Sequence, residues 1–242
     1  MATSKMRRII RKYRPAPLIQ ATRFLIQPLF RGLFHLLSHV KIEGHENVPQ
    51  QGAYLVVFNH VSLYDPPVVL AFWPSKLEIL GAIEIWSKKG QGVLARLWGG
   101  IPIRRTELHR DAIDQSLSVL QSDLPLLLSP EGGRSHQPGL RKAKAGIVYL
   151  AETTRVPIIP VGVTGTTDDF FQKAIHGERP LIELNIGSPF TLPATLEEPS
   201  LAPRDIRQKK ADYIMARIAE LLPASYRGYY GGMQPGGVNL AI

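Results

Sequence analysis

The sequence predicts an α/β fold, in which helices flank a mostly parallel β-sheet and an amphipathic helical appendage precedes it. From about residue 42, short apolar runs alternate with amphipathic stretches, a pattern typical of a parallel sheet with helices on both faces. Before that point the composition differs, because residues 1–41 hold nine Lys or Arg and no acidic residue. We therefore expect two units, residues 1–40 and 41–242.

The basic charge of this 242-residue chain belongs to its N-terminal unit. The formal net charge is +9, and residues 42–242 carry 20 basic and 20 acidic side chains, so that part is neutral. The chain has no cysteine. Disulfides, thiolate metal sites and a cysteine nucleophile are therefore excluded.

Residues 1–14 form a basic arm, which Pro15 and Pro17 separate from a predicted helix over residues 18–40. In that helix the polar residues recur every three or four positions and form a narrow stripe, while the remaining surface is rich in Leu and Phe. The stripe consists of Gln20, Arg23, Gln27, Arg31, His35 and Ser38. Arg23 and Arg31 interrupt the apolar residues, which disfavours a membrane-spanning helix.

This segment is typical of an interfacial helix, with its apolar bulk toward acyl chains and its arginines toward lipid headgroups. We therefore expect residues 1–40 to bind an anionic membrane surface, as part of a peripheral protein on the cytoplasmic face of the cell membrane. A core-packing helix with a solvated basic face is the alternative. A nucleic-acid-binding arm is disfavoured by the wide Leu and Phe face, so we expect no nucleic-acid partner.

The elements of the main unit follow from short runs rich in Val, Ile and Leu, and from amphipathic stretches between them. Strands are expected at residues 53–58, 77–81, 101–103, 125–129, 158–163 and 181–186. Helices are expected at residues 66–72, 92–97, 108–121, 143–154 and 204–222. In such sheets, functional residues gather at the carboxyl ends of the strands.

A histidine and an aspartate follow the first of these strands, as His60 and Asp65. The pair can close on itself if the intervening residues form a turn and Asp65 begins a helix, which Pro66 favours at the first helical position. The carboxylate would then accept one imidazole N–H and leave the other nitrogen as a general base. By itself this spacing is a weak signal, because most histidines have structural roles.

Other chemistries lack their motifs. The sequence contains no Gly-x-Ser-x-Gly elbow, no phosphate-binding loop, no dinucleotide-binding glycine motif and no zinc-binding His spacing. A His–Asp pair without a protein nucleophile suits direct attack by an acceptor hydroxyl on an activated acyl carbonyl. A thioester donor fits, because a thiolate with a pKa near ~8.5 is a good leaving group.

Four motifs occur along the chain in a recognisable order. They are Asn-His-x-x-x-x-Asp at 59–65, Gly-Gly-Ile-Pro-Ile-Arg-Arg at 99–105, Pro-Glu-Gly-Gly-Arg-Ser at 130–135 and Val-Pro-Ile-Ile-Pro-Val at 156–161. With these motifs the chain resembles the 1-acylglycerol-3-phosphate acyltransferase family of the bacterial lysophosphatidate acyltransferase type, from about residue 40 onward. The order and spacing of all four carry the resemblance.

The resemblance implies an acyltransferase fold of roughly seven strands and an enzyme of phospholipid synthesis. Its expected reaction moves a fatty acyl chain from acyl-CoA or acyl carrier protein to the free hydroxyl of a lysophospholipid, 1-acylglycerol-3-phosphate first among them, with no cofactor or metal. His60 would be the base and Asp65 its orienting partner. The residues expected to bind the acceptor are Arg104, Arg105, Glu131, Gly132, Gly133 and Arg134.

Two positions depart from the family pattern. Many relatives carry a phosphate-binding Lys where this chain has Ala82, and a Thr where it has Gly133. The loss of the Lys leaves open a different lysolipid or alcohol as acceptor. A non-catalytic lipid-binding protein on the same fold is a further alternative, against which the intact His60 and Asp65 argue.

Overall fold

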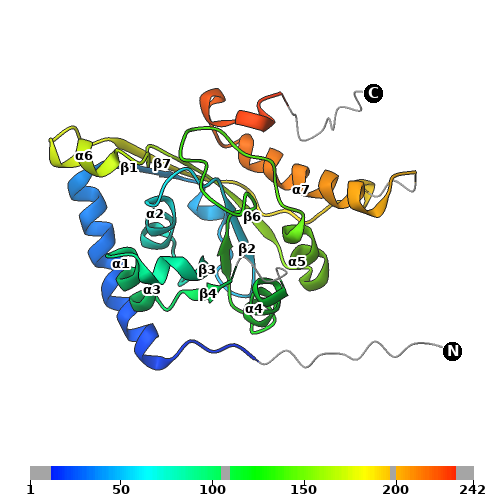
Figure 1. Cartoon of the computed structure of the whole chain (residues 1–242), viewed down its shortest axis with the longest axis horizontal. Helices are drawn as coiled ribbons and strands as arrows, with labels where there is room; N and C mark the ends of the chain where they lie inside the picture. The colour runs from blue at the N-terminus through cyan, green and yellow to red at the C-terminus, as the bar shows by residue number, and fades with distance from the viewer. Residues whose placement is uncertain (1–11, 105–109, 197–199, 233–242) are drawn as a thin grey trace.

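The computed structural model describes residues 12–104, 110–196 and 200–232, and shows a seven-stranded sheet with helices on both faces (Figure 1). The strand order is β1-β7-β6-β2-β5-β3-β4, and every neighbouring pair is parallel except β6 and β7. The strands are β1 His39–Glu43, β2 Leu55–Phe58, β3 Glu78–Ala82, β4 Ile101–Ile103, β5 Leu126–Leu128, β6 Ile158–Thr164 and β7 Leu181–Ile186. The mostly parallel α/β fold predicted from the sequence is thereby confirmed.

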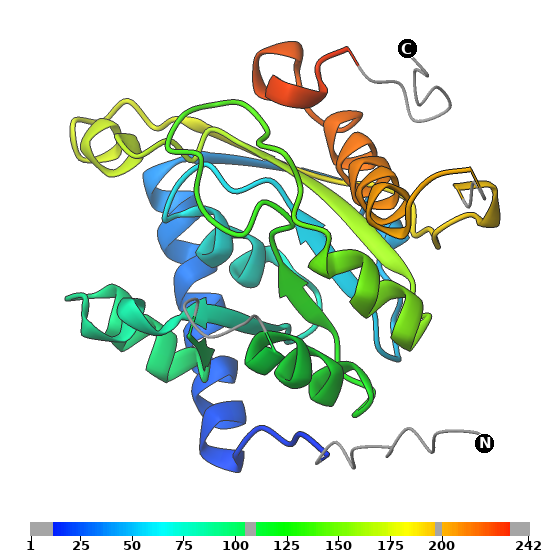
Figure 2. The same cartoon turned by 45° about the vertical axis from the view of Figure 1, so that its right-hand side comes forward.

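The helices cover the two faces of the sheet separately, as Figures 1 and 2 show. Residues of α1, α2, α3 and α6 share one apolar core with the sheet, and residues of α4, α5 and α7 share the other. The helices are α1 Pro17–Leu37, α2 Asp65–Phe72, α3 Gln91–Trp98, α4 Arg110–Leu120, α5 Gly146–Thr154, α6 Phe170–Ile175 and α7 Pro203–Ala219. Such two-sided coverage explains why the central strands are apolar on both faces.

All six predicted strands and all five predicted helices of the main unit are present, with small differences at their ends. Among the α-helices and strands of the described residues, two were not predicted. Strand β1 is an edge strand whose Lys41 and Glu43 interrupt the apolar pattern, and α6 is only six residues long. The expected boundary between the two units at residue 40 falls within β1. Residues 1–11 of the expected basic arm lie outside the described residues.

Helix α1 is amphipathic, but its polar stripe faces the protein. Arg23 and Gln27 are buried, with 2% and 5% of their surface exposed. The apolar residues of the opposite face are exposed instead, about 70% in most cases: Leu18, Phe24, Leu25, Leu29 and Leu36. The expectation that Arg23 points toward lipid headgroups is therefore wrong. In the described part of the chain, no helix is both long enough and apolar enough to cross a membrane.

The last carbonyl groups of a helix have no hydrogen-bond partners within that helix. The polar stripe of α1 binds such carbonyl groups at the C-terminal ends of two other helices. The side-chain amide of Gln27 donates hydrogen bonds of 2.8 Å to the carbonyls of Leu70 and Trp73, at the end of α2. Arg23 Nε donates to the carbonyl of Trp98, at the end of α3, over 2.6 Å. Helix α1 therefore caps α2 and α3, which explains why its polar residues face inward.

Candidate active site

The first and third motifs meet at the carboxyl ends of two neighbouring parallel strands. Strands β2 and β5 pair in register, with Val57 opposite Leu128, so the segments that follow them emerge side by side. Asn59 fixes the first segment to β6, because its side-chain amide exchanges two hydrogen bonds with the backbone of Val163, of 2.7 and 2.8 Å. The backbone N–H of Ser135 donates to the carbonyl of His60 over 2.8 Å and joins the two segments.

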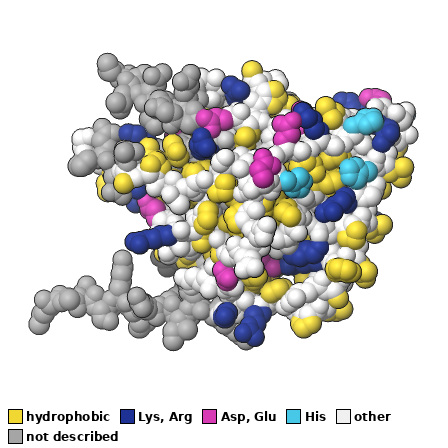
Figure 3. All heavy atoms as spheres, turned by 180° about the vertical axis from the view of Figure 1, so that it is seen from behind, with side chains coloured by type: hydrophobic (Ala, Val, Ile, Leu, Met, Phe, Trp, Pro, Cys, Tyr) yellow, Lys and Arg dark blue, Asp and Glu magenta, His cyan; other side chains and the backbone are white. Residues whose placement is uncertain are grey.

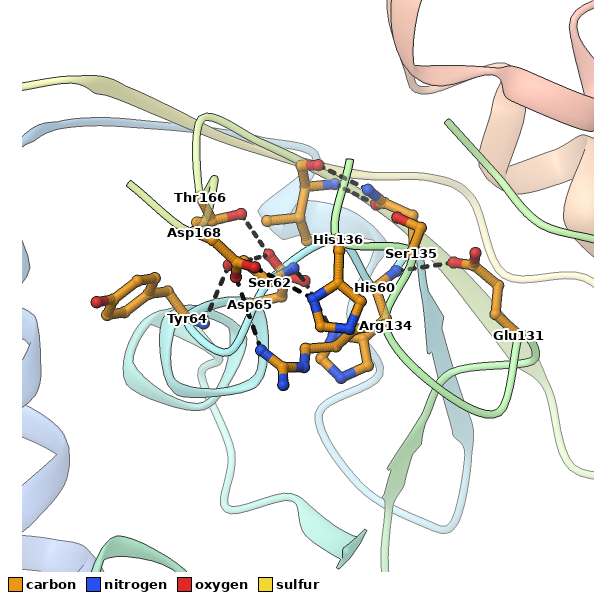
Figure 4. A network of polar contacts seen from close by, with 12 residues as sticks. His60, Ser62, Tyr64, Asp65, Glu131, Arg134, Ser135, His136, Thr166 and Asp168 are labelled. Carbon is orange, nitrogen blue, oxygen red and sulfur yellow. Dashed lines mark hydrogen bonds and ion pairs between the residues drawn. The ribbon is translucent and has the colours of Figure 1, made fainter. Parts of the chain in front are cut away.

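His60 and Asp65 face one another across the turn that precedes α2 (Figure 4). Nδ1 of His60 lies 2.9 Å from Oδ2 of Asp65, and the backbone N–H of Ser62 donates to the same oxygen over 2.8 Å. Asp65 is the first residue of α2, where the helix dipole favours a negative charge. Its side chain is fully buried, whereas His60 is 18% exposed. This arrangement holds the Nδ1 proton on the Asp65 side and leaves Nε2 as the basic nitrogen.

Glu131 supports the backbone of His60. Its Oε1 accepts the backbone N–H of His60 over 2.8 Å, and its Oε2 accepts that of Arg141 over 2.9 Å. Burial raises the pKa of Glu131, and the two N–H groups oppose that rise. Both carboxylate oxygens thus bind the protein, and a contact of Glu131 with the acceptor stays a prediction.

Arg134 directly precedes Ser135, whose backbone binds His60, and it shares a carboxylate with His136 (Figure 4). Nη1 of Arg134 lies 3.6 Å from Oδ1 of Asp168, and Nδ1 of His136 lies 3.2 Å from Oδ2 of the same residue. Asp168 comes from the loop after β6 and was not predicted from the sequence, because it lies outside the four motifs. The only signal was its position after the carboxyl end of a central strand.

The other predicted acceptor-binding residues lie in two places. Gly132 has φ +69°, in the left-handed region that favours glycine, and Gly133 follows it in the same loop. Arg104 follows the edge strand β4 and is exposed, with β3 between β4 and β5. Arg105 lies outside the described residues. The structure thus joins His60, Asp65 and Glu131 by direct hydrogen bonds, whereas Arg134 lies in the same loop as Glu131 and pairs with Asp168.

A further residue of this network, Thr166, was also missed. Its hydroxyl donates to Oδ1 of Asp65, on the side away from His60 (Figure 4). The geometry suits a general base: an imidazole oriented by a buried carboxylate and partly open to solvent. The guanidinium of Arg134, in the loop after β5, is a group that pairs with anions.

Comparison with known proteins identifies the family to which the chain is similar. A family model described as Acyltransferase matches residues 39–164, just over half of the chain. Mouse 1-acyl-sn-glycerol-3-phosphate acyltransferase alpha is 30% identical over 138 residues, which cover 55% of this chain and 48% of the mouse protein. The 1-acyl-sn-glycerol-3-phosphate acyltransferase of Borreliella burgdorferi is 23% identical over 143 residues, or 57% of each chain. The chain thus spans about half the length of these relatives.

The fold resembles a solved structure more extensively. The crystal structure of the 1-acyl-sn-glycerophosphate acyltransferase PlsC from Thermotoga maritima superposes with a TM-score of 0.61 at 22% sequence identity. The superposition covers 84% of this chain and 80% of that one. The shared architecture therefore extends well beyond the segment that the family model matches.

Proposed function

Because the chain belongs to the acyltransferase family, we propose that it transfers a fatty acyl chain from an acyl thioester to the free hydroxyl of a lysophospholipid. The observation that carries this proposal is the His60–Asp65 pair, with Nδ1 and Oδ2 2.9 Å apart at the carboxyl end of β2. The donor is acyl-CoA or acyl carrier protein. The acceptor that the relatives' names favour is 1-acylglycerol-3-phosphate.

His60 acts as the general base in this reaction. Its Nε2 takes the proton of the acceptor hydroxyl while the hydroxyl oxygen attacks the thioester carbonyl carbon, and Asp65 stabilises the imidazolium that forms. When the tetrahedral intermediate collapses, the carbon–sulfur bond breaks, and the departing thiolate receives the proton from His60. The products are the ester and a free thiol, and His60 returns to its neutral form.

Arg134 is the residue best placed to bind the acceptor's phosphate. It directly precedes Ser135, whose backbone N–H donates to the carbonyl of His60, and a guanidinium pairs with phosphate oxygens through two hydrogen bonds. Gly132 and Gly133 leave the loop backbone accessible. The resemblance alone assigns Arg104 and Arg105 to binding the acceptor's phosphate. Glu131 acts in this scheme through the backbone of His60.

A second acceptor class is favoured by two observations. Ala82, at the end of β3, is buried and carries no cation, and the carboxylate of Asp168 pairs with Arg134 over 3.6 Å. Fewer free cations suit an acceptor whose headgroup carries less negative charge than a phosphate monoester. The alternative to 1-acylglycerol-3-phosphate is therefore another lysolipid or alcohol in the same reaction.

We also propose that the protein attaches peripherally to the cytoplasmic face of the cell membrane through α1. The exposed apolar side of this helix supports the proposal, and apolar side chains gather along that side of the molecule in Figure 3. Burying apolar surface in the acyl region contributes about 25 cal/mol per Å². Lysolipids reside in the bilayer, so attachment there would bring the enzyme to its acceptor.

The release of thiol from acyl-CoA, measured with a panel of lysolipids, tests the proposed reaction. We expect one or more lysolipids to stimulate release, and His60→Ala to lower that rate roughly 10²–10⁴-fold. His176→Ala is the matched control, because His176 is exposed and follows α6, outside the network described above. A wild-type rate for His60→Ala, or no stimulation by any acceptor, would contradict the assignment.

A further inference from the structure

Thr166 reaches the site through a turn that only glycine permits. Strand β6 ends at Thr164, and Gly165 has φ +81°. A Cβ at Gly165 would lie 1.9 Å from the carbonyl oxygen of Leu181, which excludes any other residue. The turn places Thr166 against Asp65, with 1% of its surface exposed (Figure 4).

The two oxygens of Asp65 have different partners. Oδ2 accepts the backbone N–H of Ser62 and lies next to Nδ1 of His60. Oδ1 accepts the hydroxyl of Thr166, and among the described residues its other partner is the hydroxyl of Ser62, at a longer 3.4 Å. A fully buried carboxylate stays ionised only when hydrogen bonds replace its hydration, and Thr166 supplies one of these bonds.

We propose that Thr166 is a positioning residue for the acyl transfer, which acts by holding Oδ1 of Asp65. This contact fixes the plane of the carboxylate, so that Oδ2 accepts the Nδ1 proton of His60 and Nε2 stays free for the acceptor's proton. Without it, the carboxylate can rotate about the bonds made by Oδ2. Thr166 itself touches neither substrate, and its role rests on the proposed function of His60.

Thr166 carries no charge, so its contact with Asp65 can be removed without changing the charge of the site. The other ionisable groups around the pair come from the loop after β5, the loop after β6 and the turn before α2. They are Glu131, Arg134, His136, Asp168 and Tyr64. A substitution of Thr166 leaves all of them in place.

The tautomer of the neutral His60 ring, measured by ¹H–¹⁵N NMR, tests this positioning independently of activity. The chain has seven histidines, and the His60→Gln spectrum assigns the signal. We expect Nδ1 to carry the proton in the wild type and in Thr166→Ser, and Thr166→Val to populate both tautomers. Thr167→Val is the matched control, because the Thr167 hydroxyl donates to Asp169 instead. Thr166→Ala removes the hydroxyl with a smaller side chain, should the Val variant fail to fold.

An unchanged His60 tautomer in both hydroxyl-free variants would overturn the proposal. In kinetics, we expect Thr166→Val to lower kcat about tenfold at an unchanged acceptor KM. A lower rate with an unchanged tautomer would indicate only a structural role, and would also overturn it. Failure of the proposed function looks different: the wild-type protein then releases no thiol, while the NMR spectrum still reports the tautomer.

Discussion

Arg23 of α1 and Glu78 of β3 form a two-bond ion pair inside the protein. Nη1 lies 2.5 Å from Oε1 and Nη2 lies 2.7 Å from Oε2, and at most 2% of either side chain is exposed. The hydroxyl of Tyr13 donates to Oε2 of Glu78 over 2.8 Å. The N-terminal segment is therefore joined to the sheet by a buried charge pair, and its removal would leave Glu78 without a counter-charge.

Loss of one partner of this pair should destabilise the protein strongly. We expect Arg23→Met to lower the free energy of unfolding by about 3–5 kcal/mol, because a buried carboxylate is left unpaired. The double variant Arg23→Met/Glu78→Leu should recover much of that loss, since no buried charge remains. Urea unfolding measures both, with Lys41→Met as the control, because Lys41 pairs with Glu43 at the surface. Equal effects of Arg23→Met and Lys41→Met would contradict this account.

Glu131 should be sensitive to an amide replacement of the same shape. Its two oxygens accept the N–H groups of His60 and Arg141, and a glutamine offers one acceptor oxygen where two are needed. Glu131→Gln should therefore lower the free energy of unfolding by about 1–3 kcal/mol, because an N–H donor then faces another donor. Thiol release should fall as well, since the His60 backbone loses its support. Glu43→Gln, at an exposed position of β1, is the control in both assays.

The sequence predicted the sheet well because its central strands are short apolar runs, and it placed His60 and Asp65 together because a turn and Pro66 constrain them locally. The orientation of α1 was not predictable in the same way. Its periodicity shows two faces, but only the tertiary structure shows that Gln27 and Arg23 meet the free carbonyls of α2 and α3. Thr166 and Asp168 were missed for a related reason: their partners lie about 100 and 30 residues away in sequence.

Asp65 should be more important for rate than for acceptor binding. An asparagine at this position has one carbonyl oxygen for donors from three residues, so its amide group must face His60, Ser62 or Thr166. We expect Asp65→Asn to lower kcat by roughly 10²–10⁴-fold with little change in the acceptor KM. Asp111→Asn is the matched control, because Asp111 is an exposed acid in the first turn of α4. A change confined to KM would show that Asp65 acts in binding.

Asp168 should compete with the acceptor for Arg134. Both side chains are partly exposed, and such pairs contribute about 0.2–1 kcal/mol. Asp168→Asn should therefore lower the KM for a phosphate-bearing acceptor about two- to fivefold, and the difference should shrink as salt is added. Asp169→Asn serves as the control, because Asp169 pairs with Lys173 in α6. A higher KM for the Asn variant would mean that Asp168 binds the acceptor directly.

The exposed side of α1 provides a test of membrane attachment that leaves the fold intact. Deleting residues 1–40 would remove Arg23 and strand β1 residues along with the apolar face, so weaker binding by such a protein would have two explanations. Leu25→Gln/Leu29→Gln changes only side chains that are 68% and 70% exposed.

We expect this double variant to bind anionic vesicles at least about tenfold more weakly, because two leucines no longer enter the acyl region. Flotation with phosphatidylglycerol-containing vesicles measures the binding, and thermal unfolding monitors the fold. Tyr149→Gln on α5 is the control, since Tyr149 is 49% exposed on the opposite side of the sheet. Undiminished binding of the double variant would exclude α1 as the docking surface, whereas equal losses in both proteins would indicate a nonspecific effect of surface polarity.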